Sequence, residues 1–347
     1  MAALITQELR KGWEFKQAAA EEWLPVARVP TNVHLDLMDN KKIEDQFLGF
    51  NELKCEWVGH KDWIYRVTLP SISTTKHGTK HVLAFDGLDT YATVELNGHT
   101  ILESDNMWIM HRVDVSDKLS SSNGNTLPIY FKAALPESQR VKAAYPEHKW
   151  VGFNGDMARL AARKAQYHYG WDWGPVLLTC GPWRSARLET YHAWVEDVRV
   201  DYEVDASFKK VSGAITATIE GAAGETVDFC VKLGEEQILN GTAEVHNGKA
   251  AVDFYIDDPK LWYPHGYGEQ TLYNVTATVR GGDESLHSVT KRTGFRKGEL
   301  VQELDEIGKS FYFRFNGIDV FCGGSDWIPA DSFTPRITEA RYGDGSR

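Results

Sequence analysis

The chain is dominated by short runs of strand-forming residues that are separated by turn signals. Residues 81–85 and 92–96 are short apolar or alternating runs, and each is followed by a turn dipeptide, Asp86-Gly87 and Asn97-Gly98. Alternation with a period of two turns one face of a strand toward a core and the other toward solvent. The pattern predicts a mainly β chain, with one helical insertion around residues 137–144.

A second set of strand-like runs begins after the linker Ala193-Trp194. Runs with turn signals at this spacing are typical of an immunoglobulin-like sandwich of about 100 residues. We therefore expect a jelly-roll-like β-sandwich over residues 1–193 and an immunoglobulin-like β-sandwich over residues 194–295. Residues 296–347 remain as a third piece.

Composition excludes several classes of partner. The formal net charge is −11, and phosphate binding needs a basic face, so no nucleic-acid partner is expected. No stretch approaches the ~20 apolar residues of a membrane span. The apolar run within residues 1–10 is too short for a signal peptide. These features predict a cytoplasmic protein with no membrane partner.

The metal-binding and redox-active residue types are scattered. His34, His60 and His168 are isolated from one another, so no metal site and no cofactor are expected. The cysteines show neither metal-ligand spacing nor a dense disulfide framework, so we interpret them as free thiols in a reducing compartment. They are Cys55, Cys180, Cys230 and Cys322.

The most informative motif is Tyr167-His168-Tyr169-Gly170-Trp171-Asp172-Trp173-Gly174-Pro175. A carboxylate can accept two hydrogen bonds from adjacent hydroxyls. An indole offers a flat apolar face to the C–H side of a sugar ring. The motif therefore has what a pyranose site needs. The alternative is that the tryptophans are core residues and Gly174-Pro175 is an ordinary turn.

This motif, with Arg163-Lys164-Ala165-Gln166 before it, resembles the signature of the β-mannosidases of glycoside hydrolase family 2. β-Galactosidases and β-glucuronidases share the family's architecture but lack the Trp-Asp-Trp block. Other blocks resemble the same family, in the family's order and over nearly the whole chain. They are Trp23-Leu24-Pro25-Val26, residues 29–34, Asp86-Gly87-Leu88-Asp89, Val94-Glu95-Leu96-Asn97-Gly98, residues 261–270 and residues 324–333.

The resemblance implies that residues 296–347 are a linker and the first strand of an incomplete (β/α)8 barrel. Residues 320–326 are expected to be that strand and its polar loop. A retaining glycosidase needs two carboxyl groups about 5.5 Å apart. In this family both are glutamates on later barrel strands, and no residue of this chain matches either motif. We therefore name no catalytic residue.

The resemblance also implies where substrate binds. Asp172 would hold hydroxyls of the non-reducing mannose, with Trp171 beside it, whereas Trp173 is expected to be a core or scaffolding residue. Trp327 and Asp331 would lie at the C-terminal end of the first barrel strand, where site residues of such barrels lie. For Asp331, a helix cap or a turn is an equally open interpretation.

Two functions from different classes follow. The first is an exo-acting β-mannosidase that releases terminal β-D-mannose from β-mannosides and manno-oligosaccharides by a retaining mechanism, this chain being its N-terminal part. The second is a non-catalytic carbohydrate-binding or scaffolding protein made of two β-sandwiches. A pair of catalytic glutamates on a downstream barrel would distinguish them.

Overall fold

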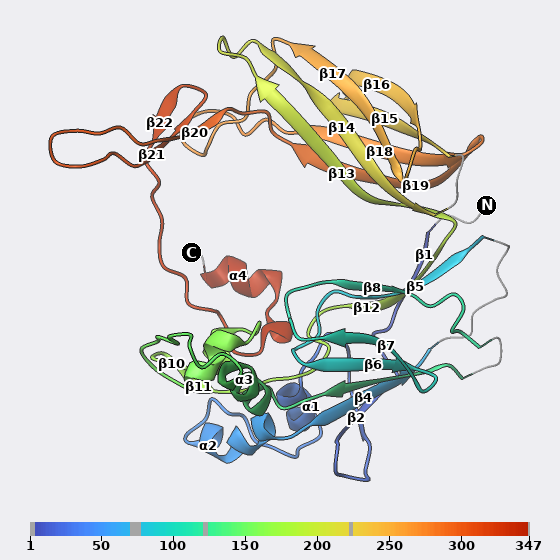
Figure 1. The fold of residues 1–347 in the computed structure, drawn as a ribbon, viewed down its shortest axis with the longest axis vertical. Helices are drawn as coiled ribbons and strands as arrows, with labels where there is room; N and C mark the ends of the chain where they lie inside the picture. The colour runs from blue at the N-terminus through green and yellow to red at the C-terminus, as the bar shows by residue number, and fades with distance from the viewer. Residues whose placement is uncertain (1–3, 70–77, 121–123, 222–224, 346–347) are drawn as a thin grey trace. The chain divides into compact units, whose positions relative to one another are not determined.

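The computed structural model describes residues 4–69, 78–120, 124–221 and 225–345. The chain divides into two compact units. The first unit comprises Thr6–Thr190 and Ile328–Arg347, and the second unit comprises Met1–Ile5 and Tyr191–Trp327. Figure 1 gives the element labels that are used below.

The first unit contains two β-sheets. The larger sheet has six strands in the order β3-β2-β4-β9-β6-β7, and the smaller has four in the order β1-β12-β5-β8. The strands of the larger sheet are β3 (Leu24–Pro25), β2 (Trp13–Gln17), β4 (Trp63–Thr68), β9 (Thr126–Phe131), β6 (Ala92–Leu96) and β7 (His99–Ser104). Those of the smaller sheet are β1 (Ile5–Glu8), β12 (Ala186–Tyr191), β5 (Lys80–Phe85) and β8 (His111–Asp114).

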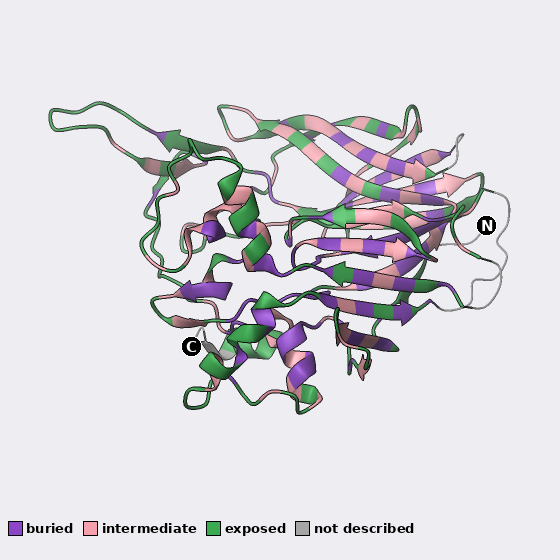
Figure 2. Ribbon diagram, turned by 60° about the horizontal axis from the view of Figure 1, so that its bottom comes forward, coloured by how far each residue is buried: buried purple, intermediate pink, exposed green. Residues whose placement is uncertain are grey.

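The core of this unit follows the period-two pattern. Along β6, Ala92, Val94 and Leu96 are buried while the residues between them are only partly covered. β4 and β9 pair antiparallel with Tyr65 opposite Ile129, and both side chains are inaccessible to solvent. Figure 2 shows this alternation of burial along the strands.

Short helices and one hairpin join the strands of the first unit. They are α1 (Val33–Asp39), α2 (Asn51–Cys55), η1 (Glu56–His60), α3 (Ala134–Ala143), η2 (Met157–Ala161), η3 (Gln166–His168), β10 (Tyr169–Trp171) and β11 (Gly174–Val176). α3 is the predicted helical insertion. It is built from strong helix formers such as Leu135, Gln139 and Arg140, and Pro146 follows its end.

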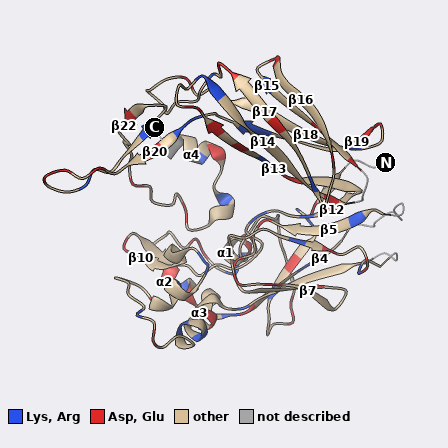
Figure 3. Ribbon diagram, turned by 45° about the horizontal axis from the view of Figure 1, so that its top comes forward, with Lys and Arg blue, Asp and Glu red and all other residues tan. Residues whose placement is uncertain are grey.

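The second unit is a seven-stranded sandwich with a short hairpin sheet. Its two main sheets have the orders β13-β14-β17 and β16-β15-β18-β19, which match an immunoglobulin-like sandwich. Their strands are β13 (Ala193–Val204), β14 (Lys210–Gly221), β17 (Lys249–Asp257), β16 (Glu236–Glu244), β15 (Thr226–Leu233), β18 (Tyr273–Gly281) and β19 (Glu284–Thr293). Inward-facing residues such as Phe229, Val231 and Val275 form its core. Acidic and basic residues both occur along β13 and β14 (Figure 3).

The third sheet has the order β20-β21-β22, with β20 (Gly298–Val301), β21 (Tyr312–Phe315) and β22 (Ile318–Val320). Asn316 and Gly317, both with positive φ, form the turn between β21 and β22, where glycine is favoured. These features confirm the prediction of a mainly β chain with two sandwiches.

The described residues do not show the barrel strand that the sequence predicts over residues 320–326. β22 ends at Val320, residues 321–329 have no regular structure, and the Phe321 side chain is 85% exposed. A barrel strand is stabilised by hydrogen bonds to a neighbour on each side and by burial of both faces. The described residues supply neither, so the barrel strand stays a prediction.

The chain returns to the first unit after Trp327. This C-terminal segment, Ile328–Arg347, contains η4 (Thr334–Arg336) and α4 (Glu339–Gly345). Phe333 is fully buried and stacks on the His34 ring of α1, with ring centroids 5.4 Å apart. The Phe333 ring therefore anchors the segment in the first unit.

Candidate functional site

The Trp-Asp-Trp motif folds as a tight β-hairpin. β10 and β11 pair antiparallel with Trp171 opposite Gly174, so Asp172 and Trp173 form the two-residue turn. The Asp172 side chain is exposed, and none of the residues that the structure describes donates a hydrogen bond to its carboxylate. The hairpin therefore presents an unpartnered carboxylate at its tip.

Aromatic and cationic side chains hold the two tryptophans. The Trp171 ring meets Phe153 edge to face at 5.2 Å, and the Arg159 guanidinium lies 4.7 Å from the centre of the indole. Trp173 lies 5.9 Å from the ring of Tyr167. The expectation that Trp173 is a core residue is wrong, because its side chain is 36% exposed, whereas a scaffolding role stays a prediction. The turn places it outside the core.

Trp173 lines a hollow beside the hairpin with a volume of about 350 Å³. The hollow is shared between the hairpin and the C-terminal segment, and it carries both aromatic and charged side chains. The lining residues that matter here are Phe47, Trp173, Asp331, Arg336 and Arg341. An indole face beside guanidinium groups suits a polar ligand with an apolar side, such as a sugar.

Asp331 lies in this hollow, but its carboxylate is already bonded within the protein. Oδ1 accepts the Phe333 backbone N–H at 2.8 Å. Oδ2 accepts from Arg336 Nε at 2.6 Å and from Arg341 Nη1 at 2.7 Å. These contacts match the turn interpretation of Asp331, and they leave a substrate contact by this carboxylate as a proposal.

The remaining sequence-predicted residue, Trp327, belongs to the second unit and has a 52% exposed side chain. The other three predicted residues, Trp171, Asp172 and Asp331, belong to the first unit, and of these only Asp331 lines the hollow.

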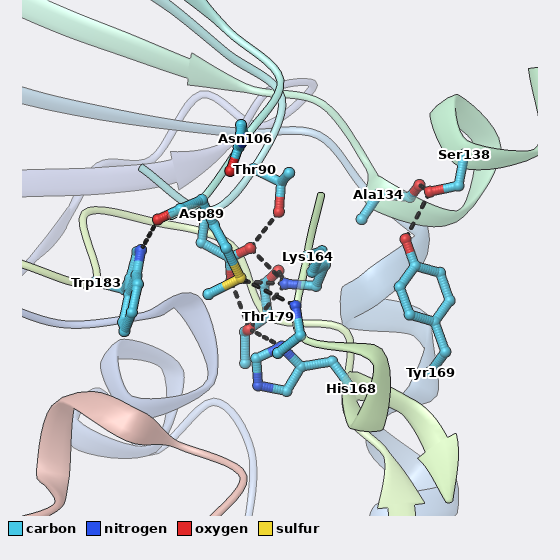
Figure 4. A network of polar contacts seen from close by, with 12 residues as sticks. Asp89, Thr90, Asn106, Ala134, Ser138, Lys164, His168, Tyr169, Thr179 and Trp183 are labelled. Carbon is cyan, nitrogen blue, oxygen red and sulfur yellow. Dashed lines mark hydrogen bonds and ion pairs between the residues drawn. The ribbon is translucent and has the colours of Figure 1, made fainter. Parts of the chain in front are cut away.

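A buried polar network forms the base of the hairpin (Figure 4). The Lys164 ammonium donates to both oxygens of the Asp89 carboxylate, at 2.5 and 2.6 Å, and both side chains are buried. The Thr179 hydroxyl donates to the same carboxylate at 2.6 Å, and the Thr90 hydroxyl does so as well. Burial alone would raise the pKa of the Asp89 carboxyl, but the Lys164 charge and these hydrogen bonds hold that pKa below its usual range. The pair is therefore ionised.

His168 connects this network to the C-terminal segment. Its Nε2 lies 2.8 Å from the Ser332 carbonyl oxygen, and its Nδ1 lies 3.3 Å from the Thr179 hydroxyl. A carbonyl oxygen can only accept, so Nε2 carries the proton. Burial, with the Lys164 charge nearby, lowers the pKa of His168 to about 3. The ring is therefore neutral near pH 7.

This neutral histidine predicts a pH dependence of stability. The unfolded chain protonates His168 below about pH 6.5, whereas the folded chain does so only near pH 3. The free energy of unfolding should therefore decrease as the pH falls through this window, by about 1.4 kcal/mol per pH unit from this one group. His34, whose pKa burial lowers to about 3, adds to the effect. Asp36, whose pKa burial raises to about 7, opposes it.

Comparison of the wild type with His168→Gln isolates the contribution of His168 to the pH dependence of stability. Urea titrations at several pH values between about 7 and 5 should show the two stability curves converging as the pH falls, because glutamine does not titrate. Curves that stay parallel would contradict a buried neutral His168.

Sequence reasoning missed Asp89, Lys164, His168 and Arg159 as parts of this region. Asp89 and Lys164 fell within blocks that resemble the family, but 75 positions separate them. Nothing in a single sequence pairs a carboxylate with an ammonium at that separation. His168 lies within the motif, but its hydrogen bond with the Ser332 carbonyl joins residues that are 164 positions apart.

The described part of the chain contains no group of three or more His, Cys, Asp or Glu side chains that could hold a metal ion. None of its helices is long and apolar enough to cross a membrane.

Comparisons with known proteins place the chain in a family. Residues 13–184 match the family "Glycosyl hydrolase 2 galactose-binding domain-like", and residues 193–296 match "Glycosyl hydrolases family 2". The chain is 45% identical to a β-mannosidase B of Aspergillus terreus, over 99% of this chain and 41% of that protein. It is 48% identical to a β-mannosidase B of Thermothelomyces thermophilus, over 100% of this chain and 41% of that protein.

Among solved structures, the chain is similar to a β-D-mannosidase from Dictyoglomus thermophilum. The TM-score is 0.85 at 35% identity, over 98% of this chain and 42% of that one. The chain thus spans about 41% of the length of the curated relatives that it matches. Because two successive family matches and these relatives together cover nearly all of it, the chain belongs to glycoside hydrolase family 2.

Proposed function

We propose that this chain forms the N-terminal part of an exo-acting β-mannosidase, which releases terminal non-reducing β-D-mannose from β-mannosides and manno-oligosaccharides by a retaining mechanism. The observation that carries the proposal is the unpartnered carboxylate of Asp172 at the tip of a hairpin, between two tryptophans. The β-mannosidases among the relatives support it.

In this proposal the hairpin binds sugar and performs no bond cleavage. The Asp172 carboxylate accepts hydrogen bonds from two adjacent hydroxyls of the terminal mannose, and the Trp171 indole covers the apolar side of the ring. Retention requires an acid/base and a nucleophile about 5.5 Å apart. We assign neither role within residues 1–347.

We also propose three domains, with the limits 1–193, 194–295 and 296–347. The last of them contains the first strand of the barrel.

The cysteines support a cytoplasmic location as part of the proposal. Cys55, Cys180, Cys230 and Cys322 are all free thiols, and Cys322 is exposed. Exposed thiols persist in reducing compartments, whereas oxidising ones favour disulfides.

The proposal predicts a clear split in activity between two forms of the protein. The 347-residue chain should not hydrolyse an aryl β-mannoside above background, because it offers no nucleophile for the glycosyl-enzyme intermediate. The product of the complete reading frame should hydrolyse it, and should prefer it over the aryl β-glucoside, β-galactoside and β-glucuronide. Release of the aryl alcohol, followed by absorbance, measures both.

The same assay tests the second candidate, a non-catalytic carbohydrate-binding or scaffolding protein. That candidate is favoured if the complete product binds manno-oligosaccharide but releases no mannose. Turnover by the 347-residue chain after rigorous removal of host mannosidase would overturn both.

A further inference from the structure

Arg159 is a buried cation next to the hairpin that the proposed function does not yet use. It lies on η2, whose first turn is capped by the Asp156 carboxylate accepting the Ala158 N–H at 2.8 Å. Arg159 is only 1% exposed, which makes it one of the largest fully buried side chains in the described part of the protein.

The guanidinium of Arg159 has no carboxylate partner among the residues that the structure describes. Nη1 donates to the Asn154 side-chain oxygen at 2.9 Å and also to the Asn154 carbonyl oxygen. Nε is buried without any hydrogen-bond partner. A buried charge without an ion pair is costly, so its surroundings must compensate in another way.

Two aromatic rings provide that compensation. The guanidinium carbon lies 4.7 Å from the Trp171 ring centre and 5.7 Å from the Phe153 ring centre, both within the range of cation–π attraction. The two rings are nearly perpendicular, at 86°. The cation therefore fixes the position of Trp171 relative to the loop that carries Phe153.

The backbone of the loop that carries Phe153 closely approaches the Arg159 guanidinium. Gly155 has φ of +65°, and a Cβ there would lie 2.8 Å from Arg159 Nη1 and 3.1 Å from the Tyr169 carbonyl oxygen. Only glycine permits this approach. The loop thus contacts the cation on one side and the first residue of β10 on the other.

We propose that Arg159 is a positioning residue, which clamps the loop of residues 152–155 against Trp171 and so fixes the hairpin tip that presents Asp172. The role in catalysis rests on the proposed function, whereas the clamp itself does not. A pyranose site requires the indole and the carboxylate to keep a fixed relative geometry, and small misplacements weaken transition-state binding.

The clamp is tested first in the 347-residue chain by hydrogen exchange of the hairpin amides, residues 169–177. Arg159→Met removes the charge but keeps much of the volume, and should raise exchange in the hairpin roughly 10- to 30-fold, the worth of a desolvated cation–π contact. Phe153→Ala tests the same clamp without disturbing the core, because the Phe153 side chain is 70% exposed, and should raise exchange in the same amides. Arg66→Met is the control, since the Arg66 guanidinium on β4 lies 3.8 Å from the centre of the Trp23 ring, in a different cation–π pair.

The positioning role is tested in the product of the complete reading frame. Arg159→Met should lower kcat/KM for an aryl β-mannoside by roughly 10- to 100-fold, mainly through kcat, because the displaced contacts are those that strengthen in the transition state. Arg159→Lys keeps the charge and should recover part of the loss. Arg66→Met should match the wild type.

The outcomes distinguish the clamp, the positioning role and the proposed function. Unchanged hairpin exchange in both Arg159→Met and Phe153→Ala would overturn the clamp. Faster exchange with unchanged kcat/KM would overturn the positioning role. Absence of mannosidase activity in the wild-type product would overturn the proposed function and leave the exchange result standing.

Discussion

Replacement of Lys164 by methionine should lower the free energy of unfolding of the first unit by about 3–5 kcal/mol, because removal of one partner leaves a buried charge unpaired. The partner left behind is Asp89, whose side chain is 1% exposed. Thr179 and Thr90 would still donate to its carboxylate. Two neutral hydrogen bonds do not replace an ammonium that contacts both oxygens.

The doubly substituted protein provides the control for this prediction. With Asp89→Asn added to Lys164→Met, neither position of the former ion pair carries a charge. The double variant should therefore be more stable than Lys164→Met alone, with a coupling of about 0.5–3 kcal/mol between the two positions. Urea unfolding of Lys164→Met, Asp89→Asn and the double variant measures this coupling. A probe specific to each unit is needed, because two units need not unfold together. A Lys164→Met chain within about 1 kcal/mol of the wild type would contradict a buried ion pair.

Loss of the Asp89–Lys164 ion pair should affect the proposed sugar-binding hairpin as well as stability. The buried network links the segment before the hairpin, which contains Lys164 and His168, to Thr179 after it through the Asp89 carboxylate. The hydrogen bond between His168 and Ser332 extends this link to the C-terminal segment. Disruption of the ion pair should therefore disturb the hairpin and the C-terminal segment together. The loss of stability and any loss of sugar binding would then have a common cause.

Local sequence patterns were sufficient to predict the strands and the main helix. The alternation at Ala92, Val94 and Leu96 is a property of adjacent residues, and so is the helix-forming composition around Gln139. The predicted turn at Asn97-Gly98 follows from the positive φ values that these two residues tolerate. Such features depend on neighbours within a few positions, which a single sequence contains.

The parts that were missed depend on contacts between distant positions. The Asp89–Lys164 pair and the His168–Ser332 hydrogen bond join residues 75 and 164 positions apart. Trp173 was expected to be a core or scaffolding residue, but a two-residue turn places its side chain outside the core. The expected barrel strand after Val320 lacks neighbouring strands in the described chain, so apolar sequence alone did not produce a strand there.

Replacement of Asp172 by alanine in the product of the complete reading frame should lower kcat/KM for an aryl β-mannoside by about one to four orders of magnitude. Hydrogen bonds to a charged group contribute roughly 1.5–3 kcal/mol each. Each 1.36 kcal/mol is about tenfold in rate when the bond strengthens in the transition state. Asp172→Asn keeps the shape and loses the charge, so its activity should lie between those of alanine and the wild type.

A sugar-binding role of Asp172 can be distinguished from a purely structural one by measuring stability. Because none of the described residues bonds the Asp172 carboxylate, Asp172→Ala should change the stability of the 347-residue chain by no more than about 0.5 kcal/mol. Glu235 is the matched control, an exposed carboxylate in the turn between β15 and β16 of the second unit. Glu235→Ala should leave both stability and kcat/KM unchanged.

The most direct test of a sugar-binding hairpin is therefore kcat/KM of Asp172→Ala, measured together with its thermal unfolding. We expect a loss of at least about tenfold in kcat/KM with an unchanged melting temperature, while Glu235→Ala matches the wild type in both. Unchanged kcat/KM in a folded Asp172→Ala enzyme, or a loss that follows the melting temperature, would contradict the account.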